Sequence, residues 1–144
     1  MSKREDFAFF HRLRVRWGEC DAQNIVFFAN YFMYFDVAMT EYFRELGYVF
    51  DGEDKLEFFT VNATADYRGS AVFDDEIDIG VRCARLGEKS LSIATAIFRG
   101  DELLTEGRLT YVHAEPNTKN TTPLPGELVE RILALEATPP ERKT

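Results

Sequence analysis

Cysteine is scarce in this sequence, because only Cys20 and Cys83 occur among 144 residues and neither belongs to a CxxC or closely spaced cysteine–histidine pattern. A disulfide scaffold or a zinc site would need such clusters, so neither is expected. Long apolar runs are also missing, and no segment approaches the ~20 residues of a membrane-spanning helix. The opening carries charge and then only a short apolar stretch, unlike a secretory signal. We therefore expect a cytoplasmic, metal-free protein.

Basic residues are in the minority: 17 Lys and Arg face 25 Asp and Glu, which gives a formal net charge of −8 at pH 7. Proteins that bind nucleic acids or acidic membranes gain affinity by neutralising phosphates, so neither partner is expected. Hydrophobic residues make up 45% of the chain, and 13 of them are Phe. This apolar content predicts a folded protein, and its length fits a single domain over residues 1–144.

Hydrophobic periodicity predicts a strand followed by one long helix. Residues 7–17 alternate, with Trp17 on the apolar face, which is typical of a half-buried strand. Apolar residues then recur at helical spacing and cover most of the helix circumference. Asn30 is a candidate N-cap and Gly47 a candidate terminator, so the helix should run from about residue 30 to 46.

Four more strands follow this helix, and a short helix closes the chain. Short links rich in Gly, Asp and Ser separate the strands, which predicts an antiparallel meander. An apolar helix must be covered on nearly all sides, and a strongly curved sheet can do so. The expected strands cover residues 59–67, 77–83, 91–98 and 103–114, and the short helix follows Pro123 and Pro125.

The segment that links the first strand to the helix resembles a family signature. It reads Arg16-Trp-Gly-Glu-Cys-Asp-Ala-Gln-Asn-Ile-Val-Phe-Phe-Ala-Asn-Tyr31 and is similar to the run before the helix of the 4-hydroxybenzoyl-CoA thioesterase family, in the hotdog superfamily. Ala65-Asp-Tyr-Arg-Gly-Ser-Ala-Val-Phe-Asp-Asp-Glu-Ile77 and Leu86-Gly-Glu-Lys-Ser90 resemble two further family motifs. The resemblance covers about residues 10 to 115. It implies an α+β hotdog fold, with a curved antiparallel sheet around one long helix and a short C-terminal helix.

Three positions depart from the family pattern. Asn24 stands where the family often has Gly, and Ser70 stands where it has Pro. Asn is among the few residues that tolerate a positive φ, so the turn should survive. Phe28 stands where relatives carry His or Tyr, which leaves the acyl group open.

The resemblance implies an acyl-CoA thioester hydrolase in which Asp21 is the catalytic carboxylate and the backbone N–H of Phe28 holds the oxyanion. The physical case is that a helix N-terminus offers free N–H donors and a favourable dipole, and Asp21 lies in the loop that leads into one. Asp21 would act as nucleophile or as general base, two roles that the sequence leaves open. The alternative for Asp21 is a purely structural Asx turn.

Other residues are candidates for binding the substrate. Phe28, Tyr31 and Phe32 crowd the helix start beside the candidate carboxylate, which predicts a pocket for a medium or aromatic acyl group. Thr60 and Asn62 lie on the polar face of the second strand and are weaker candidates for orienting water or the acyl group.

Coenzyme A carries phosphates, so an acidic protein that binds it needs a local cationic patch. Arg82, Arg85, Lys89 and Arg99 are expected near the turn before the fourth strand, and the resemblance places nucleotide contacts on Lys89 and Ser90. It also implies a homodimer or homotetramer, and no cofactor apart from the coenzyme A of the substrate.

Several alternatives remain. Cys20 is a poor nucleophile candidate because no His lies in its loop, and His11 and His113 fall in strand patterns. A hotdog hydratase would need a His opposite the helix terminus, and residues 18–30 contain none. A non-catalytic hotdog module that binds an acyl thioester or a partner protein, and a thioesterase acting on acyl carrier protein, both stay open.

Overall fold

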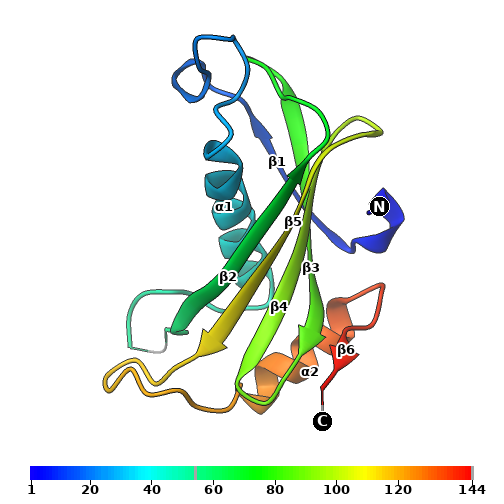
Figure 1. Cartoon of the computed structure of the whole chain (residues 1–144). Helices are drawn as coiled ribbons and strands as arrows, with labels where there is room; N and C mark the ends of the chain where they lie inside the picture. The colour runs from blue at the N-terminus through cyan, green and yellow to red at the C-terminus, as the bar shows by residue number, and fades with distance from the viewer. Residues whose placement is uncertain (54, 144) are drawn as a thin grey trace.

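The computed structural model describes residues 1–53 and 55–143 of the chain. It contains the expected order of one strand, one long helix, four strands and a short helix (Figure 1). No helix in these described ranges is long and apolar enough to cross a membrane. The elements are η1 (Arg4–Asp6), β1 (Phe9–Arg14), η2 (Trp17–Glu19), α1 (Asn30–Glu45), β2 (Phe58–Tyr67), β3 (Glu76–Leu86), β4 (Ser90–Arg99), β5 (Glu102–His113), α2 (Gly126–Leu135) and β6 (Glu141–Arg142).

The sheet has the strand order β1-β3-β4-β5-β2, and β6 adds to β3. The expected meander is therefore correct for β3, β4 and β5 but wrong for β2, which pairs antiparallel with β5 at the edge of the sheet. The reason is the link over residues 68–75, which is too long for a tight turn. It crosses the end of the sheet and lets β1 occupy the place beside β3.

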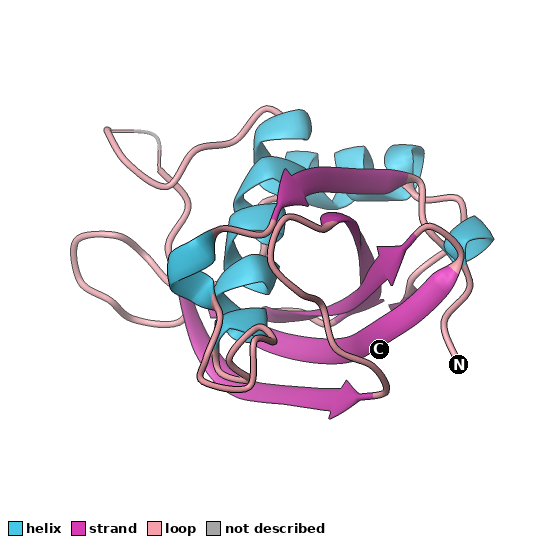
Figure 2. Cartoon of the chain, turned by 90° about the horizontal axis from the view of Figure 1, so that it is seen from above, coloured by secondary structure: helices cyan, strands magenta, loops and turns pink. Residues whose placement is uncertain are grey.

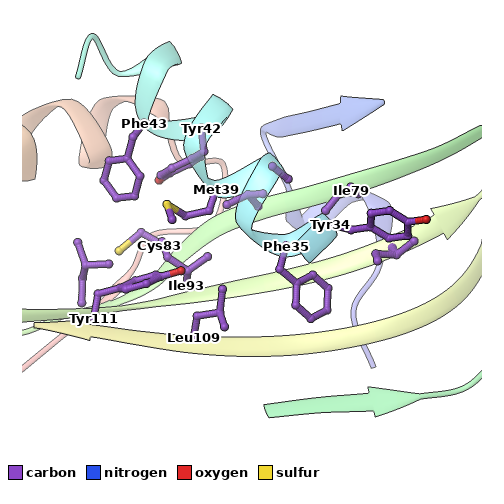
Figure 3. Packing of buried hydrophobic residues seen from close by; sticks show 14 of the residues in the cluster. Tyr34, Phe35, Met39, Tyr42, Phe43, Ile79, Cys83, Ile93, Leu109 and Tyr111 are labelled. Carbon is purple, nitrogen blue, oxygen red and sulfur yellow. The ribbon is translucent and has the colours of Figure 1, made fainter. Parts of the chain in front are cut away.

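Helix α1 packs against the concave face of the sheet, which curves around it (Figure 2). Its buried side chains interdigitate with those of β3, β4 and β5 (Figure 3). Phe35 lies so close to β5 that a Cβ on Gly107 would approach its ring to 2.5 Å. The helix ends as expected, because Gly47 adopts φ +90°, a left-handed conformation that Gly accepts readily. The curved sheet around one long helix is confirmed.

The first strand is shorter than its alternation predicts. β1 ends at Arg14, and the chain then turns into η2. Trp17 is therefore not on the apolar face of a strand but 72% exposed. The cause is a capping box in which the Arg16 N–H donates to Glu19 Oε1 at 2.8 Å. The turn places the aromatic ring in solvent next to the loop that leads to α1.

The N-terminal segment covers the convex face of the sheet. Phe7 is buried against Phe98 and sits over Gly80, where a Cβ would approach the Phe7 ring to 2.7 Å. Beside it, Arg12 Nε and Arg4 Nη2 donate to the Asp78 carboxylate at 2.8 and 2.9 Å. These contacts hold the beginning of the chain on the sheet.

The outer edge of β3 is occupied along most of its length by three different partners. β1 pairs with β3 as far as Val81. The Cys83 N–H then donates to the Glu136 carboxylate at 2.8 Å, and the same oxygen accepts the hydroxyl of Tyr42. β6 pairs with the last residues of β3 in parallel. Glu136 thus fills the gap between two strands and fixes the path of the C-terminal segment.

Candidate active site

The loop between β1 and α1 is organised around a buried carboxylate. Glu19 is only 8% exposed, and its Oε1 accepts the Tyr34 hydroxyl at 2.9 Å. The expected N-cap is wrong, because the N-cap is Ala29 and Asn30 is the first helical residue. The Asn30 side chain binds the loop instead: its Nδ2 donates to the Glu19 carbonyl at 2.9 Å. Sequence reasoning missed Glu19, although the spacing Arg16-x-x-Glu19 is a capping-box signal. These bonds fix the loop relative to the helix start.

Asp21 lies in this loop and is partly exposed. Its Oδ1 accepts the Gln23 N–H at 2.8 Å, and its carbonyl accepts the Asn24 N–H at 2.9 Å. Asn24 has φ 64°, which confirms that Asn supplies the positive φ expected there. The Asx turn is therefore present. Among described residues, no donor contacts Oδ2, so the turn leaves one carboxylate oxygen open for chemistry.

A cavity of about 400 Å³ opens beside Asp21, a size typical of small-molecule sites. The rings of Trp17 and Phe73 flank it, 5.5 Å apart and nearly perpendicular, and Phe73 is 49% exposed. Sequence reasoning missed both rings, because Trp17 read as part of a strand and Phe73 as part of a link. The lining residues are Trp17, Gly18, Cys20, Asp21, Asn24 and Phe73.

Free backbone donors lie at the start of α1. In the described part of the chain, the N–H groups of Phe28 and Ala29 have no hydrogen-bond partner. The Phe27 carbonyl accepts the Asn30 N–H at 2.8 Å. Since N–H and C=O point in opposite directions across a trans peptide, this bond directs the Phe28 N–H away from the helix. Tyr67 Oη donates to the Phe28 carbonyl at 2.9 Å and similarly fixes the next peptide.

The three aromatic candidates at the helix start have different surroundings. Phe28 is 62% exposed. Phe32 is half-buried against Phe35, with ring centroids 5.7 Å apart. Tyr31 is buried, and its hydroxyl accepts the Ala71 N–H at 3.0 Å. Burial raises the pKa of the Tyr31 phenol, so it remains a neutral hydroxyl that holds the link before β3. Phe28 is therefore the most accessible of the three.

Cys20 shares the cavity but is a poor nucleophile. Its partly buried position, together with the negative charges of Asp21 and Glu19, raises the pKa of the thiol. A thiol needs to ionise before it attacks a carbonyl carbon. His113, one of the two His residues of the chain, does not serve as a base for Cys20, because its Nδ1 forms hydrogen bonds with the Thr122 and Pro123 carbonyls.

The candidate nucleotide-binding residues meet at the β3–β4 turn. Arg85, Lys89 and Ser90 line a cavity of about 360 Å³, and Arg85 Nη2 donates to Ser90 Oγ at 3.2 Å. Arg99 does not join them, because it lies at the other end of β4 and pairs with Asp75 at 2.7 Å. The cavity is completed by Gly87, Glu88 and Lys143, of which Lys143 was not anticipated from the sequence.

Thr60 and Asn62 lie on the exposed edge strand β2, but on opposite faces. Thr60 is opposite Tyr111, whereas Asn62 is opposite Thr110 after a bulge in the register. The expected shared polar face is therefore wrong, because a bulge inserts one residue and reverses the alternation. Neither residue lines the cavity beside Asp21.

The loop before α1, which lines one cavity, and the β3–β4 turn, which lines the other, lie at opposite ends of the fold (Figure 1). The loop before α1 bridges to Val72, just before β3 begins, whereas Lys89 follows the end of β3. β3 has 11 residues, so the two ends are separated by on the order of 30 Å. The fold of a single chain does not bring Asp21 and Lys89 together.

Comparison with known proteins agrees with this architecture. A Pseudomonas aeruginosa strain PAO1 protein has 27% identity and a TM-score of 0.85, over 95% of this chain and 97% of that one. A Thermus thermophilus thioesterase, solved with coenzyme A and zinc, has 28% identity and a TM-score of 0.79, over 94% and 98%. A gentisyl-coenzyme A thioesterase has 25% identity and a TM-score of 0.77, over 83% and 98%. The family model described as the thioesterase-like superfamily matches residues 15–132. The expected relationship is confirmed: this chain belongs to the thioesterase-like superfamily and has its hotdog fold.

Proposed function

We propose that this protein hydrolyses acyl-CoA thioesters to a free acid and coenzyme A. The observation that carries the proposal is the placement of Asp21 in a cavity of the loop that leads to α1, seven residues before the free N–H of Phe28. A carboxylate and preorganised N–H donors are the two groups that thioester hydrolysis needs. Relatives named as thioesterases, one of them solved with coenzyme A, support the same reaction.

In the general-base route, the Asp21 carboxylate takes a proton from water as the oxygen attacks the thioester carbonyl. The carbonyl oxygen becomes an oxyanion that accepts the Phe28 N–H, and the positive end of the α1 dipole stabilises its charge. Collapse of the intermediate breaks the C–S bond, and the thiolate takes the proton from Asp21. In the nucleophilic route, Asp21 itself attacks, expels the thiolate and forms a mixed anhydride, which water then hydrolyses.

The acyl group is assigned to the exposed aromatic rings around Asp21. Trp17 and Phe73 line the same cavity as Asp21, and Phe28 is exposed at the helix start. Together these rings offer more apolar surface than an acetyl group can cover, so medium or aromatic acyl groups are the favoured substrates. Phe32 is a further candidate, half-buried in the first turn of α1 against Phe35.

The nucleotide is assigned to the cavity at the β3–β4 turn. Arg85 and Lys89 supply positive charge there, and Ser90 supplies a hydroxyl. Neither cation forms an ion pair with a described carboxylate, unlike Arg12, Arg16 and most other arginines. Unpaired cations in a concave site suit a phosphate ligand.

We further propose a homodimer, alone or within a tetramer, that pairs β2 with β2 of a second copy. β2 is a ten-residue edge strand that is exposed along most of its length, which is a template for strand addition. Antiparallel pairing places the β3–β4 turn of one protomer at the same end as Asp21 of its partner. This arrangement accounts for the distance between the two cavities within one protomer.

The Asp21→Asn variant tests the chemistry. Asn keeps an oxygen that can accept the Gln23 N–H, so the Asx turn and the fold should persist, while the amide can neither attack nor take a proton. Thiol release from a panel of acetyl, octanoyl and benzoyl thioesters should fall at least ~100-fold. Asp101→Asn, which removes a charge in the β4–β5 turn, should retain wild-type activity. Full activity in Asp21→Asn would refute the assignment.

Co-expression of two defective chains tests the shared site. A dimer of Asp21→Asn with Lys89→Glu contains one site with both residues intact and one site that lacks both. Random pairing should therefore restore about a quarter of wild-type kcat/KM at low substrate, although each variant alone is impaired. No recovery in proven heterodimers would place each complete site within one protomer.

A further inference from the structure

The C-terminal strand β6 brings a residue into the cavity at the β3–β4 turn that sequence reasoning did not connect with it. Arg85 and Lys89 come from that turn, whereas Lys143 is separated from Lys89 by the whole of β4, β5 and α2. The Lys143 N–H donates to the Leu86 carbonyl at 2.9 Å, directly before the turn. The fold therefore joins the end of the chain to this cavity through backbone pairing.

The direction of the Lys143 side chain follows from the strand register. Glu141 is opposite Arg85 and Arg142 is opposite Leu86 in the parallel pair. Lys143 directly follows β6 and continues its pairing through the bond to Leu86, so the alternation of side chains directs it to the face of Arg85 and Arg142 to the other face. Arg142 accordingly does not line the cavity, whereas Lys143 does.

The C-terminal segment is anchored before it reaches the cavity. The Glu136 carboxylate binds the Cys83 N–H and the Tyr42 hydroxyl, and Thr138 Oγ1 donates to the Asp6 carbonyl at 3.2 Å. Pro140 is buried directly before β6. Such anchoring reduces the conformational entropy that a lysine near a chain end would otherwise lose on binding a ligand.

The charge in the cavity is unbalanced. Arg85, Lys89 and Lys143 face one lining carboxylate, that of Glu88, with Glu141 on the neighbouring strand. None of the three cations forms an ion pair with a described carboxylate, although the chain as a whole carries a charge of −8. Three unpaired cations in a cavity of about 360 Å³ suit a small ligand with more than one phosphate.

We propose that Lys143 is a nucleotide-binding residue: β6 supplies it as the third cation of a phosphate site formed with Arg85 and Lys89. This rests on the proposed function, in which the cavity receives the nucleotide of coenzyme A. Docking of the C-terminal strand and binding of the nucleotide are then coupled, because each orders the other.

Titration calorimetry with adenosine 3′,5′-bisphosphate tests the proposal without requiring any hydrolysis. Lys143→Ala should weaken binding about fivefold, the effect of losing one charge-assisted contact, and 1 M salt should reduce the difference. Arg142→Ala is the matched control, since it removes a charge from the neighbouring residue, on the other face, and it should bind as wild type. With a thioester substrate, Lys143→Ala should raise KM for the coenzyme A form and change kcat little.

Equal affinity in wild type and Lys143→Ala would overturn the proposal. An equal loss in Lys143→Ala and Arg142→Ala would also overturn it, because the effect would then be general surface charge. If the bisphosphate does not bind but Lys143→Ala raises KM for acyl carrier protein thioesters, the site recognises an acidic protein and the nucleotide assignment is wrong. If the bisphosphate titration gives the expected difference while no thioester is hydrolysed, only the proposed reaction fails.

Discussion

Glu136 should be needed as a hydrogen-bond acceptor rather than as a charge. One of its oxygens accepts both the Cys83 N–H and the Tyr42 hydroxyl, and Tyr42 has no exposed surface. Glu136→Ala would leave both donors without a partner, and an orphaned buried donor costs about 1 to 3 kcal/mol. Loss of the buried carboxylate offsets part of this cost. We expect Glu136→Ala to lower the free energy of unfolding by about 2 to 4 kcal/mol.

Glu136→Gln separates the role of Glu136 as a hydrogen-bond acceptor from the role of its charge. The amide oxygen can accept the same two donors, so Glu136→Gln should be more stable at pH 7 than Glu136→Ala, although its NH2 group takes the buried place of Oε1, which has no partner among the described residues. Burial raises the pKa of the Glu136 carboxyl above its ordinary value. The unfolded chain therefore loses its proton first, and wild type should lose stability relative to Glu136→Gln as pH rises from about 4 through the folded pKa.

Urea unfolding followed by circular dichroism at pH 4 and pH 7 measures these differences. Tyr42→Phe is an independent check, since it removes one donor but keeps the carboxylate, and it should cost about 1 to 1.5 kcal/mol. If Glu136→Gln is as unstable as Glu136→Ala, the negative charge is what holds the C-terminal segment, and the acceptor argument is wrong.

Two further perturbations test the packing and the convex face. Gly107→Ala should lower the free energy of unfolding in urea by at least about 2 kcal/mol, because the new Cβ would lie 2.5 Å from Phe35 Cε2 and 2.8 Å from Thr95 Oγ1. Adding Phe35→Leu should restore part of this loss. If Gly107→Ala alone is as stable as wild type, this close packing is refuted. Asp78→Asn should cost about 1 kcal/mol at pH 7, since its arginine partners are partly exposed. The hydrogen bond from Arg12 holds the pKa of the Asp78 carboxyl below its ordinary value, so this stability is present above the unfolded pKa and is lost as pH falls through the folded one. A difference between wild type and Asp78→Asn that does not shrink as the pH is lowered would contradict the ion pairing.

Local signals in the sequence were sufficient for the helix and for the existence of the strands. The long helix was expected over about 30–46 and is observed at Asn30–Glu45, because apolar spacing and Gly47 agree on its end. The position of β2 could not be predicted in this way. Strand order depends on where the link over residues 68–75 crosses the sheet, and alternation within a strand contains no information about its neighbour.

Only part of the candidate site could be predicted, because local sequence patterns do not determine which distant residues become neighbours. Asp21 lies in a motif that is continuous in sequence, and the resemblance of this and two further motifs to one family makes it a candidate. Trp17 and Phe73 are far apart in the chain, and they flank one cavity only after η2 has turned Trp17 out of the strand. Lys143 is more remote still, because parallel pairing over two residues brings it to the β3–β4 turn. Contacts of this kind depend on tertiary structure rather than on local propensity.

The unequal edges of the sheet bear on how far strand addition can proceed. β2 offers ten residues with one charged side chain, Asp66, whereas β1 offers six residues that include Arg12 and Arg14. Short, charged edges resist pairing with another strand. Once two copies have joined through β2, the outward edge of each copy is therefore β1, and the addition of further strands is disfavoured. Strand addition should therefore stop at two copies and not continue into fibrils. Substitutions that remove Arg12 and Arg14 from β1 are the changes that we expect to promote aggregation.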